Sequence, residues 1–239
     1  MTSTPLLDSD GQDACKAAKS CATPNTPIVL ASASPRRREL LEKIGLQFVV
    51  APADVNEEAL PYRTPRELAI KAAYAKACAI EPRFPRAILL AADTVVALDG
   101  KVYGKPVTPD DAARMLRELS GRRHSVITGV VVKESGKMAV LDAVETWVSF
   151  RELTETEIEN YVASGEPMDK AGAYAIQGGA SAFVTHIEGD YWNVVGLPVA
   201  RLVELLGSFL DVRPFQQKLR ELRSQVLVLG PLFQNPPEG

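Results

Sequence analysis

Three consecutive arginines stand where a helix is expected to begin, in the segment Ser34-Pro35-Arg36-Arg37-Arg38. Its serine is a favourable N-cap residue and its proline a favourable first helical residue. Cations in the first turn oppose the helix dipole, by roughly 0.3–1 kcal/mol each when exposed. Free backbone N–H groups, the hydroxyls of Ser32 and Ser34, and Arg guanidinium groups together suit a polyphosphate. The segment therefore predicts a phosphate site. The alternative is a solvated basic face in which Arg38 pairs with Glu42.

A single carboxylate, Asp93, interrupts the apolar run of residues 87–98. The run otherwise has the pattern of a fully buried strand, and an unpaired buried carboxylate costs several kcal/mol. Asp93 is therefore expected to meet a cation, a metal or strong hydrogen-bond donors. Such a carboxylate can serve as a general base or as a Mg²⁺ ligand. The alternative is an aspartate at a strand end that caps the following loop.

Two further segments carry groups that can contact a nucleotide. Lys105 lies on an expected loop and can reach a phosphate, although a lone lysine is more often solvated. Residues 169–179 contain three glycines that allow close backbone approach. Gln177 in this stretch offers both a donor and an acceptor, as a base edge requires. The same stretch could equally form a bulged strand.

Strands and helices are expected to alternate through the part of the chain that carries these residues. The expected strands cover residues 28–32, 87–98, 125–133, 138–150 and 182–187, and the expected helices cover 34–45, 64–79, 108–121, 154–164, 198–210 and 214–228. This order, with one inserted hairpin, predicts an α/β fold with a mixed sheet. The first strand leads directly into the arginine-rich helix, where α/β proteins bind anions.

The pattern divides the chain into three regions. Residues 1–26 lack the continuous apolar run of a secretory signal and contain no arginine, so we expect a disordered extension. Residues 27–210 form the expected globular domain. Residues 211–239 are expected to form a C-terminal helix and a proline-containing tail.

Composition argues against several classes of protein. The 239 residues include 27 Lys and Arg and 30 Asp and Glu, a formal net charge of −3, whereas a nucleic-acid coat needs excess cations. No stretch approaches the ~18–20 apolar residues of a membrane helix. The odd number of cysteines, 3, fits a reducing compartment, and we expect the cytoplasm. Neither histidine has a nearby second zinc ligand, and the nucleotide motifs of Walker A and dinucleotide-binding proteins do not open a helix here.

Five segments carry the candidate residues in order along the chain. They are Ser32-Ala33-Ser34-Pro35-Arg36-Arg37, Ala92-Asp93-Thr94, Gly104-Lys105-Pro106, Asp169-Lys170-Ala171-Gly172-Ala173-Tyr174 with Gln177-Gly178, and Asn193-Val194-Val195-Gly196-Leu197-Pro198. Together they resemble the Maf family of nucleoside triphosphate pyrophosphatases, over about residues 28–210. The fourth segment looks like the dTTP/UTP pyrophosphatase subgroup, because the 7-methyl-GTP subgroup differs there.

The resemblance implies a reaction and a fold. Nucleoside triphosphates, namely dTTP, UTP and modified pyrimidine nucleotides, would be hydrolysed to the monophosphate and pyrophosphate, which cleans the nucleotide pool. The fold would be Maf/ITPase-like, an elongated mixed sheet with helices in two lobes around a central cleft. The family also implies a homodimer. From the composition, neither a nucleic acid nor a membrane is expected as a partner.

The resemblance further implies roles for single residues. Asp93 resembles the family's proton acceptor, which would activate water at the α-phosphorus. The cationic side chains around the triphosphate would stabilise charge in the transition state, and they are Arg36, Arg37, Lys76 and Lys105. The implied substrate-binding residues are Ser32, Arg36, Arg37, Lys76, Thr94, Lys105 and Gln177, of which Arg37, Thr94 and Gln177 match positions linked to base choice.

A divalent metal cation, Mg²⁺ or Mn²⁺, is the cofactor that the resemblance implies. Glu57 resembles an acid that would share the cation with Asp93. Asn56 stands where an acid is frequent in the family.

Three alternatives stay open at this point. The enzyme could be a broader pyrophosphatase that accepts ITP or 7-methyl-GTP. It could instead be a nucleotide-binding regulator of septum formation, with hydrolysis incidental. Third, it could be an interaction protein whose two extensions carry the function.

Overall fold

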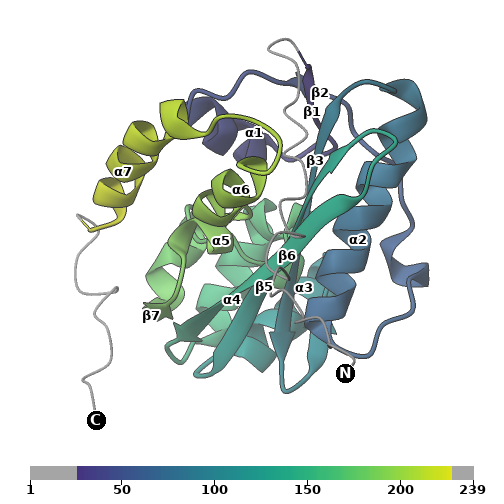
Figure 1. The fold of residues 1–239 in the computed structure, drawn as a ribbon. Helices are drawn as coiled ribbons and strands as arrows, with labels where there is room; N and C mark the ends of the chain where they lie inside the picture. Colours follow the sequence, from purple (N-terminus) through teal and green to yellow (C-terminus); the bar gives the residue numbers. More distant parts are fainter. Residues whose placement is uncertain (1–25, 228–239) are drawn as a thin grey trace, which may run out of the picture.

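A computed structural model describes residues 26–227, in which seven strands form one mixed sheet (Figure 1). The strands follow the order β2-β1-β3-β5-β6-β7, and β4 pairs with β3. Their bounds are β1 Ile28–Leu30, β2 Val49–Val50, β3 Ile88–Leu98, β4 Lys101–Tyr103, β5 Arg123–Glu134, β6 Ala139–Phe150 and β7 Val184–Glu188. The predictions for residues 1–25 and for the tail from residue 228 lie outside the described residues.

Helices cover both faces of the sheet. They are α1 Pro35–Lys43, α2 Pro65–Ile80, α3 Pro109–Leu119, α4 Glu155–Ala163, α5 Tyr191–Val195, α6 Val199–Leu206 and α7 Arg213–Leu227. Helix α2 packs on one face, and the other helices form two groups on the opposite face, α1 with α5, α6 and α7, and α3 with α4 (Figure 1). The α/β class with a mixed sheet is therefore confirmed, and the two groups of helices correspond to the two expected lobes.

The side chains of β3 alternate between two hydrophobic clusters. Leu90 and Val96 join the larger cluster on the face of α1, α3 and α6. Leu89 and Ala91 join a smaller cluster that includes Ala77 of α2. Because β3 is buried on both faces, a charged residue within it needs a partner.

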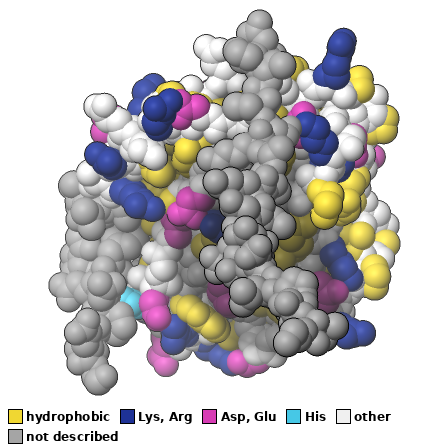
Figure 2. Space-filling model, viewed as in Figure 1, with side chains coloured by type: hydrophobic (Ala, Val, Ile, Leu, Met, Phe, Trp, Pro, Cys, Tyr) yellow, Lys and Arg dark blue, Asp and Glu magenta, His cyan; other side chains and the backbone are white. Residues whose placement is uncertain are grey.

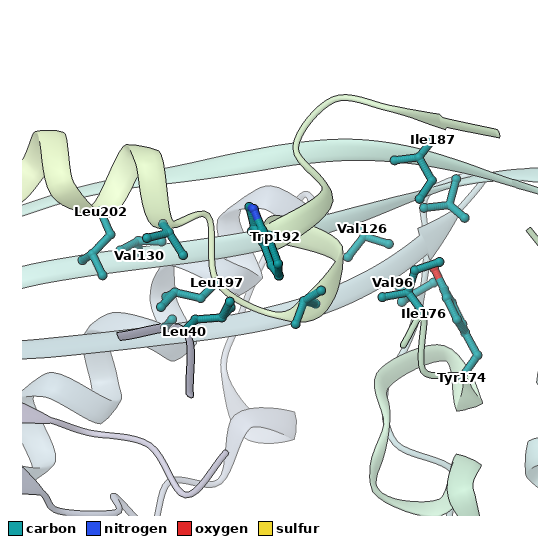
Figure 3. Packing of buried hydrophobic residues seen from close by; sticks show 14 of the residues in the cluster. Leu40, Val96, Val126, Val130, Tyr174, Ile176, Ile187, Trp192, Leu197 and Leu202 are labelled. Atoms are coloured by element: carbon teal, nitrogen blue, oxygen red, sulfur yellow. The ribbon is translucent and has the colours of Figure 1, made fainter. Parts of the chain in front are cut away.

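The larger cluster is continuous between the two groups of helices (Figure 3). Leu40 of α1 lies toward the left of the view, Trp192 of α5 near its centre, and Tyr174 and Ile176 toward the right. Val126 of β5 lies between them. One core therefore holds the two lobes against the same sheet.

The predicted elements are confirmed in type, with several differences in detail. Helix α6 ends at Leu206 instead of residue 210, because Gly207 follows as its cap. Residues 169–179 form short turns of 3-10 helix, not a bulged strand, because Gly172 takes a positive φ of 69°. Strands β2 and β4 and helix α5 were not predicted, since elements of two to five residues show no period.

The edge of β3 is open at its centre. Strand β5 pairs with β3 from Ile88 to Ala97 on one side. On the other side, β1 pairs with Ile88–Leu90 and β4 pairs with Val96–Leu98. Among the described residues, 91–95 therefore have no strand partner on that side. This interval contains Asp93 and lies where the chain leaves β1 for α1.

No helix within residues 26–227 is both long and apolar enough to cross a bilayer. On the face shown in Figure 2, the described Lys and Arg side chains are interspersed with Asp and Glu. No continuous basic patch is visible on that face.

Candidate functional site

Arg37 is the buried arginine of the cationic helix start. Its side chain, only 8% exposed, turns in from α1. The guanidinium donates from Nε to the Gly196 carbonyl at 2.9 Å, from Nη1 to Ser32 Oγ at 3.1 Å and from Nη2 to Thr94 Oγ1 at 3.0 Å. Burial lowers the pKa of Arg37, and the nearby Asp93 carboxylate opposes that shift. Three of the five guanidinium N–H groups are used by these bonds, and the other two make no hydrogen bond within the described residues.

The helix start itself differs from the prediction in one contact. Ser34 is the N-cap residue of α1, but its side chain makes no capping hydrogen bond. Its N–H instead donates to Ser32 Oγ at 3.2 Å, so that hydroxyl accepts from both Ser34 and Arg37. Arg38 pairs with Glu42 at 2.8 Å on the surface, as expected for a solvated face. That alternative holds for Arg38 and is wrong for Arg37, which is buried.

Thr94 continues this network across the sheet. Its Oγ1 lies 2.9 Å from Thr128 Oγ1 on β5, and the Thr128 hydroxyl donates to the Asn193 carbonyl at 3.3 Å. Thr128 was not predicted, because threonine is an ordinary residue of a buried strand and carries no distinct signal. The network fixes the Thr94 hydroxyl beside Arg37.

Asp93 lies at the middle of β3 and points toward α2. It is 5% exposed. Its Oδ1 accepts from Lys76 Nζ at 2.5 Å, and the same Nζ lies 2.6 Å from Glu57 Oε1. The prediction that Asp93 meets a cation is therefore confirmed. The strand-end alternative is wrong, because Asp93 pairs with Gly129 inside the ladder.

The environment of Asp93 suits a proton acceptor. Burial raises the pKa of this carboxyl above its ordinary value of 3.8, and the neighbouring Glu57 raises it further. Lys76 and Arg37 act in the opposite direction on the same pKa. A buried carboxylate with a raised pKa and cationic neighbours is typical of catalytic sites.

Gly129 lets α2 approach the sheet beside Asp93. A Cβ on Gly129 would lie 2.2 Å from the Ala69 carbonyl oxygen and 2.6 Å from the Ile70 nitrogen, both on the α2 backbone. The helix therefore rests directly on β5, which brings Lys76 within reach of Asp93. The sequence signal for such contact is an isolated glycine inside a predicted strand.

Arg36, Lys105 and Gln177 lie on the segments around this centre. Arg36 is half-buried and interacts electrostatically with Asp169. Lys105 is exposed, and Gln177 is exposed with a hydrogen bond to Tyr191. The Lys105 loop is joined to the 171–173 turn by a bond from Gly172 N–H to the Gly104 carbonyl, 3.0 Å long.

The structure thus joins two sets of the predicted residues. Arg37 donates hydrogen bonds to both Ser32 and Thr94. Lys76 forms ion pairs with both Glu57 and Asp93. Within residues 26–227, no hydrogen bond or ion pair links the other three, Arg36, Lys105 and Gln177, to Asp93.

The two carboxylates fit a cation shared with a substrate. The described residues contain no group of three or more His, Cys, Asp and Glu that could hold a metal alone. Mg²⁺ commonly binds one or two carboxylates and completes its shell with water and substrate phosphates. Glu57 and Asp93 supply such a pair, because one ammonium group already lies between them.

Comparisons with known proteins cover most of the chain. The family model described as Maf-like protein matches residues 27–209. The chain is 52% identical over 183 residues to a dTTP/UTP pyrophosphatase of Geobacter sp. (strain M21), covering 76% of this chain and 95% of the relative. It is 50% identical over 182 residues to a dTTP/UTP pyrophosphatase of Symbiobacterium thermophilum, covering 76% and 93%.

Similarity to solved structures is weaker. A HAM1 protein from Coxiella burnetii aligns with a TM-score of 0.43 and 17% identity, covering 76% of this chain and 98% of that chain. The sequence comparisons are decisive, because relatives of 50% identity align over nearly their whole length. The chain belongs to the Maf family.

Proposed function

We propose that the protein hydrolyses nucleoside triphosphates to the monophosphate and pyrophosphate, with dTTP and UTP as preferred substrates. The observation that carries this proposal is Asp93, buried at the open interval of β3 between Lys76 and Arg37. The relatives named dTTP/UTP pyrophosphatase support the choice of substrate. In the cell, the reaction would remove unsuitable pyrimidine nucleotides from the pool.

Asp93 is the proposed proton acceptor. In the described structure only its Oδ1 is hydrogen-bonded, so Oδ2 can accept a proton from water. The water oxygen bonds to the α-phosphorus while the bond from that phosphorus to the α–β bridging oxygen breaks. The electron pair of the broken bond leaves with pyrophosphate.

The cations around Asp93 are proposed to hold the triphosphate. Arg37 is preorganised by its three hydrogen bonds, so its remaining N–H groups face a ligand without further loss of side-chain entropy. Arg36 and Lys105 bring positive charge from the helix start and from an exposed loop. Together these groups stabilise the charge that develops on the departing pyrophosphate.

Glu57 and Asp93 are the residues that would hold a divalent cation, Mg²⁺ or Mn²⁺. When bound, the cation neutralises phosphate charge and polarises the phosphoryl oxygens. Base choice is assigned to Arg37, Thr94 and Gln177. The first two are fixed in one hydrogen-bonded network, and Gln177 presents both a donor and an acceptor.

A panel of nucleotides tests the proposal. Turnover of dTTP, UTP, CTP, GTP, ITP and 7-methyl-GTP is measured with Mg²⁺ or Mn²⁺, and pyrophosphate is resolved from phosphate. Fastest turnover with dTTP or UTP supports the proposal, whereas preference for ITP or 7-methyl-GTP favours a broader enzyme. Tight nucleotide binding without turnover would favour a regulatory protein.

The variant Asp93→Asn tests the assignment of the proton acceptor. We expect kcat to fall about 10²–10⁴-fold, the usual contribution of a general base. Asp110→Asn, on the exposed first turn of α3, is the matched control and should retain activity. Full turnover by a folded Asp93→Asn protein would refute the assignment.

We also propose that the protein acts as a homodimer in the cytoplasm. The small number of cysteines, 3, supports a reducing compartment. Sedimentation equilibrium tests the assembly, and a mass of one chain at micromolar concentration would contradict it.

A further inference from the structure

The ammonium group of Lys76 lies between the two carboxylates that are proposed to hold the metal. Its Nζ is 2.5 Å from Asp93 Oδ1 and 2.6 Å from Glu57 Oε1. The Lys76 side chain is 12% exposed and the Asp93 side chain 8% exposed, so the interaction between these two groups is weakly screened. One positive charge here lies between two negative charges, so the three side chains together carry a net charge of −1.

A divalent cation bridging the same two oxygens would need the position that Nζ holds. Two cations cannot share one position, because their repulsion rises steeply at short distance in a poorly solvated site. Lys76 and the metal are therefore competitors for Asp93 Oδ1 and Glu57 Oε1.

The structure leaves Lys76 free to move away. In the described part of the chain, its ammonium group has hydrogen bonds or ion pairs with Asp93 and Glu57 alone. Its four-carbon stem is flexible, and Lys ammonium groups bind phosphate as point charges. Glu57 lies on the short 3-10 helix Glu57–Ala59 with its side chain 44% exposed, so one side of the pair faces solvent.

We propose that Lys76 is a placeholder cation, displaced from Asp93 and Glu57 when a divalent metal binds. The released ammonium group then contacts the substrate phosphates. The metal and the nucleotide therefore bind cooperatively. The metal replaces Lys76 as the partner of Asp93 and Glu57, and the nucleotide phosphates replace these carboxylates as the partner of Lys76. The inference rests on the proposed function for the identity of both ligands.

Mn²⁺ binding to the nucleotide-free protein tests the proposal without any turnover. Free Mn²⁺ is measured by its electron paramagnetic resonance signal during titration of the wild type, Lys76→Met and Lys76→Gln. Removing the competing charge should tighten Mn²⁺ binding at least about tenfold in both variants. Lys71→Met is the matched control, since Lys71 is also on α2 but pairs with Glu67 on the surface, and it should bind as the wild type does.

A labelling experiment on the wild type makes the test independent of how the variants fold. Acetic anhydride modifies free amines, and mass spectrometry reports the modification of Lys76. Saturating Mn²⁺ should increase labelling of Lys76 and leave that of Lys71 unchanged. Unchanged or reduced labelling of Lys76, or Mn²⁺ binding in folded Lys76 variants no tighter than in the wild type, would overturn the proposal.

Failure of the placeholder role is distinguishable from failure of the proposed function. If the wild type releases pyrophosphate but the Lys76 variants bind Mn²⁺ no more tightly, only the placeholder role fails. If the variants bind Mn²⁺ more tightly but the wild type hydrolyses no nucleotide, only the proposed function fails.

Discussion

At the scale of single residues, the Asp93 carboxylate is buried, where ionisation is costly, and it has charged neighbours. Burial and Glu57 raise the pKa of Asp93, and Lys76 and Arg37 lower it. The net result of these opposing influences is a pKa of Asp93 above the ordinary value of 3.8. A base of this kind is a better proton acceptor near neutral pH than an exposed aspartate.

The position of the acid limb of the pH profile follows from this balance. Turnover needs ionised Asp93, so kcat/KM should fall about tenfold per pH unit below the Asp93 pKa. Arg37→Gln removes an influence that lowers that pKa, so the limb should move to higher pH. Glu159→Gln on exposed α4 is the control. A limb that stays in place or moves to lower pH in Arg37→Gln would contradict this assignment of the limb to Asp93.

The hydrogen bonds of Arg37 make a second prediction at this scale. Arg37→Lys keeps the charge but cannot reach Gly196, Ser32 and Thr94 together, which leaves buried acceptors unpaired. We expect a loss of about 1–3 kcal/mol in unfolding free energy by urea titration, together with a raised KM. Arg38→Lys, whose parent residue pairs only with Glu42, should change neither quantity. Equal stability of both variants would contradict the structural role of Arg37.

Sequence reasoning identified Asp93 because a lone carboxylate in an apolar strand is costly without a partner. It identified Arg37 because the cationic helix start opposes the helix dipole. It could not show that Arg37 is buried and Arg38 exposed, or that Lys76 holds both Asp93 and Glu57. These contacts depend on how α1, α2 and the segment before α2 pack on the sheet, and local pattern carries no such information.

At the scale of elements, the distance between α2 and the sheet determines the geometry of the charged cluster. Gly129 faces Asp93 across the ladder and contacts the α2 backbone at Ala69. Lys76 lies farther along the same helix, so a shift of α2 away from β5 would separate Lys76 from Asp93. The glycine is therefore a requirement of the site as well as of the fold.

Gly129→Ala tests this dependence. A Cβ 2.2 Å from the Ala69 oxygen forces α2 to move. We expect about 1–3 kcal/mol lower unfolding free energy, as for other overpacked cores, and a fall in kcat larger than the rise in KM. The stability control is Gly104→Ala, because nothing lies within 4 Å of a Cβ there. A variant with unchanged kcat would show that the Lys76–Asp93 distance tolerates the movement of α2.

The open interval of β3 is the feature of the elements that sequence could not predict. The expected strand of residues 87–98 matches β3 closely, and the strand of residues 28–32 matches β1 at its start. Strand β1 ends at Leu30, two residues before the expected end. Strand β4 has three residues and follows a tight Asp99-Gly100 turn. Tertiary packing decides where the short strands β1 and β4 stop pairing with the long strand β3.

At the scale of the whole molecule, one continuous core supports both groups of helices. His124 lies within it, fully buried, with Nε2 2.9 Å from the Tyr174 hydroxyl. Burial lowers the pKa of His124 to about 4 from 6.5. The native state therefore binds fewer protons than the unfolded chain between these two values.

Acid should weaken the fold in the corresponding window. Because His124 is neutral in the native state, stability falls as pH drops from 6.5 toward about 4. A shift of this size is worth about 3 kcal/mol. Urea unfolding at pH 7 and pH 5 should show about 2 kcal/mol of this loss in the wild type and a smaller loss in His124→Gln. An identical loss in both proteins would assign the acid sensitivity to other groups.

The α/β class and the order of long elements followed from sequence because apolar periodicity and turn residues are local. The family resemblance, confirmed by the Maf-like match over residues 27–209, extended this to the expected two lobes. Helix α7, Arg213–Leu227, lies beyond that match, yet its Leu222 is buried in the main core. Its packing shows that the described structure continues past the family domain.

Hydrolysis of dTTP in ¹⁸O-labelled water tests the central claim most directly, namely that the protein directs a water molecule to attack the α-phosphorus. Mass spectrometry of the products shows which phosphorus received the water oxygen. The account predicts one labelled oxygen in dTMP and unlabelled pyrophosphate. Label in pyrophosphate, or release of labelled phosphate with dTDP, would contradict it.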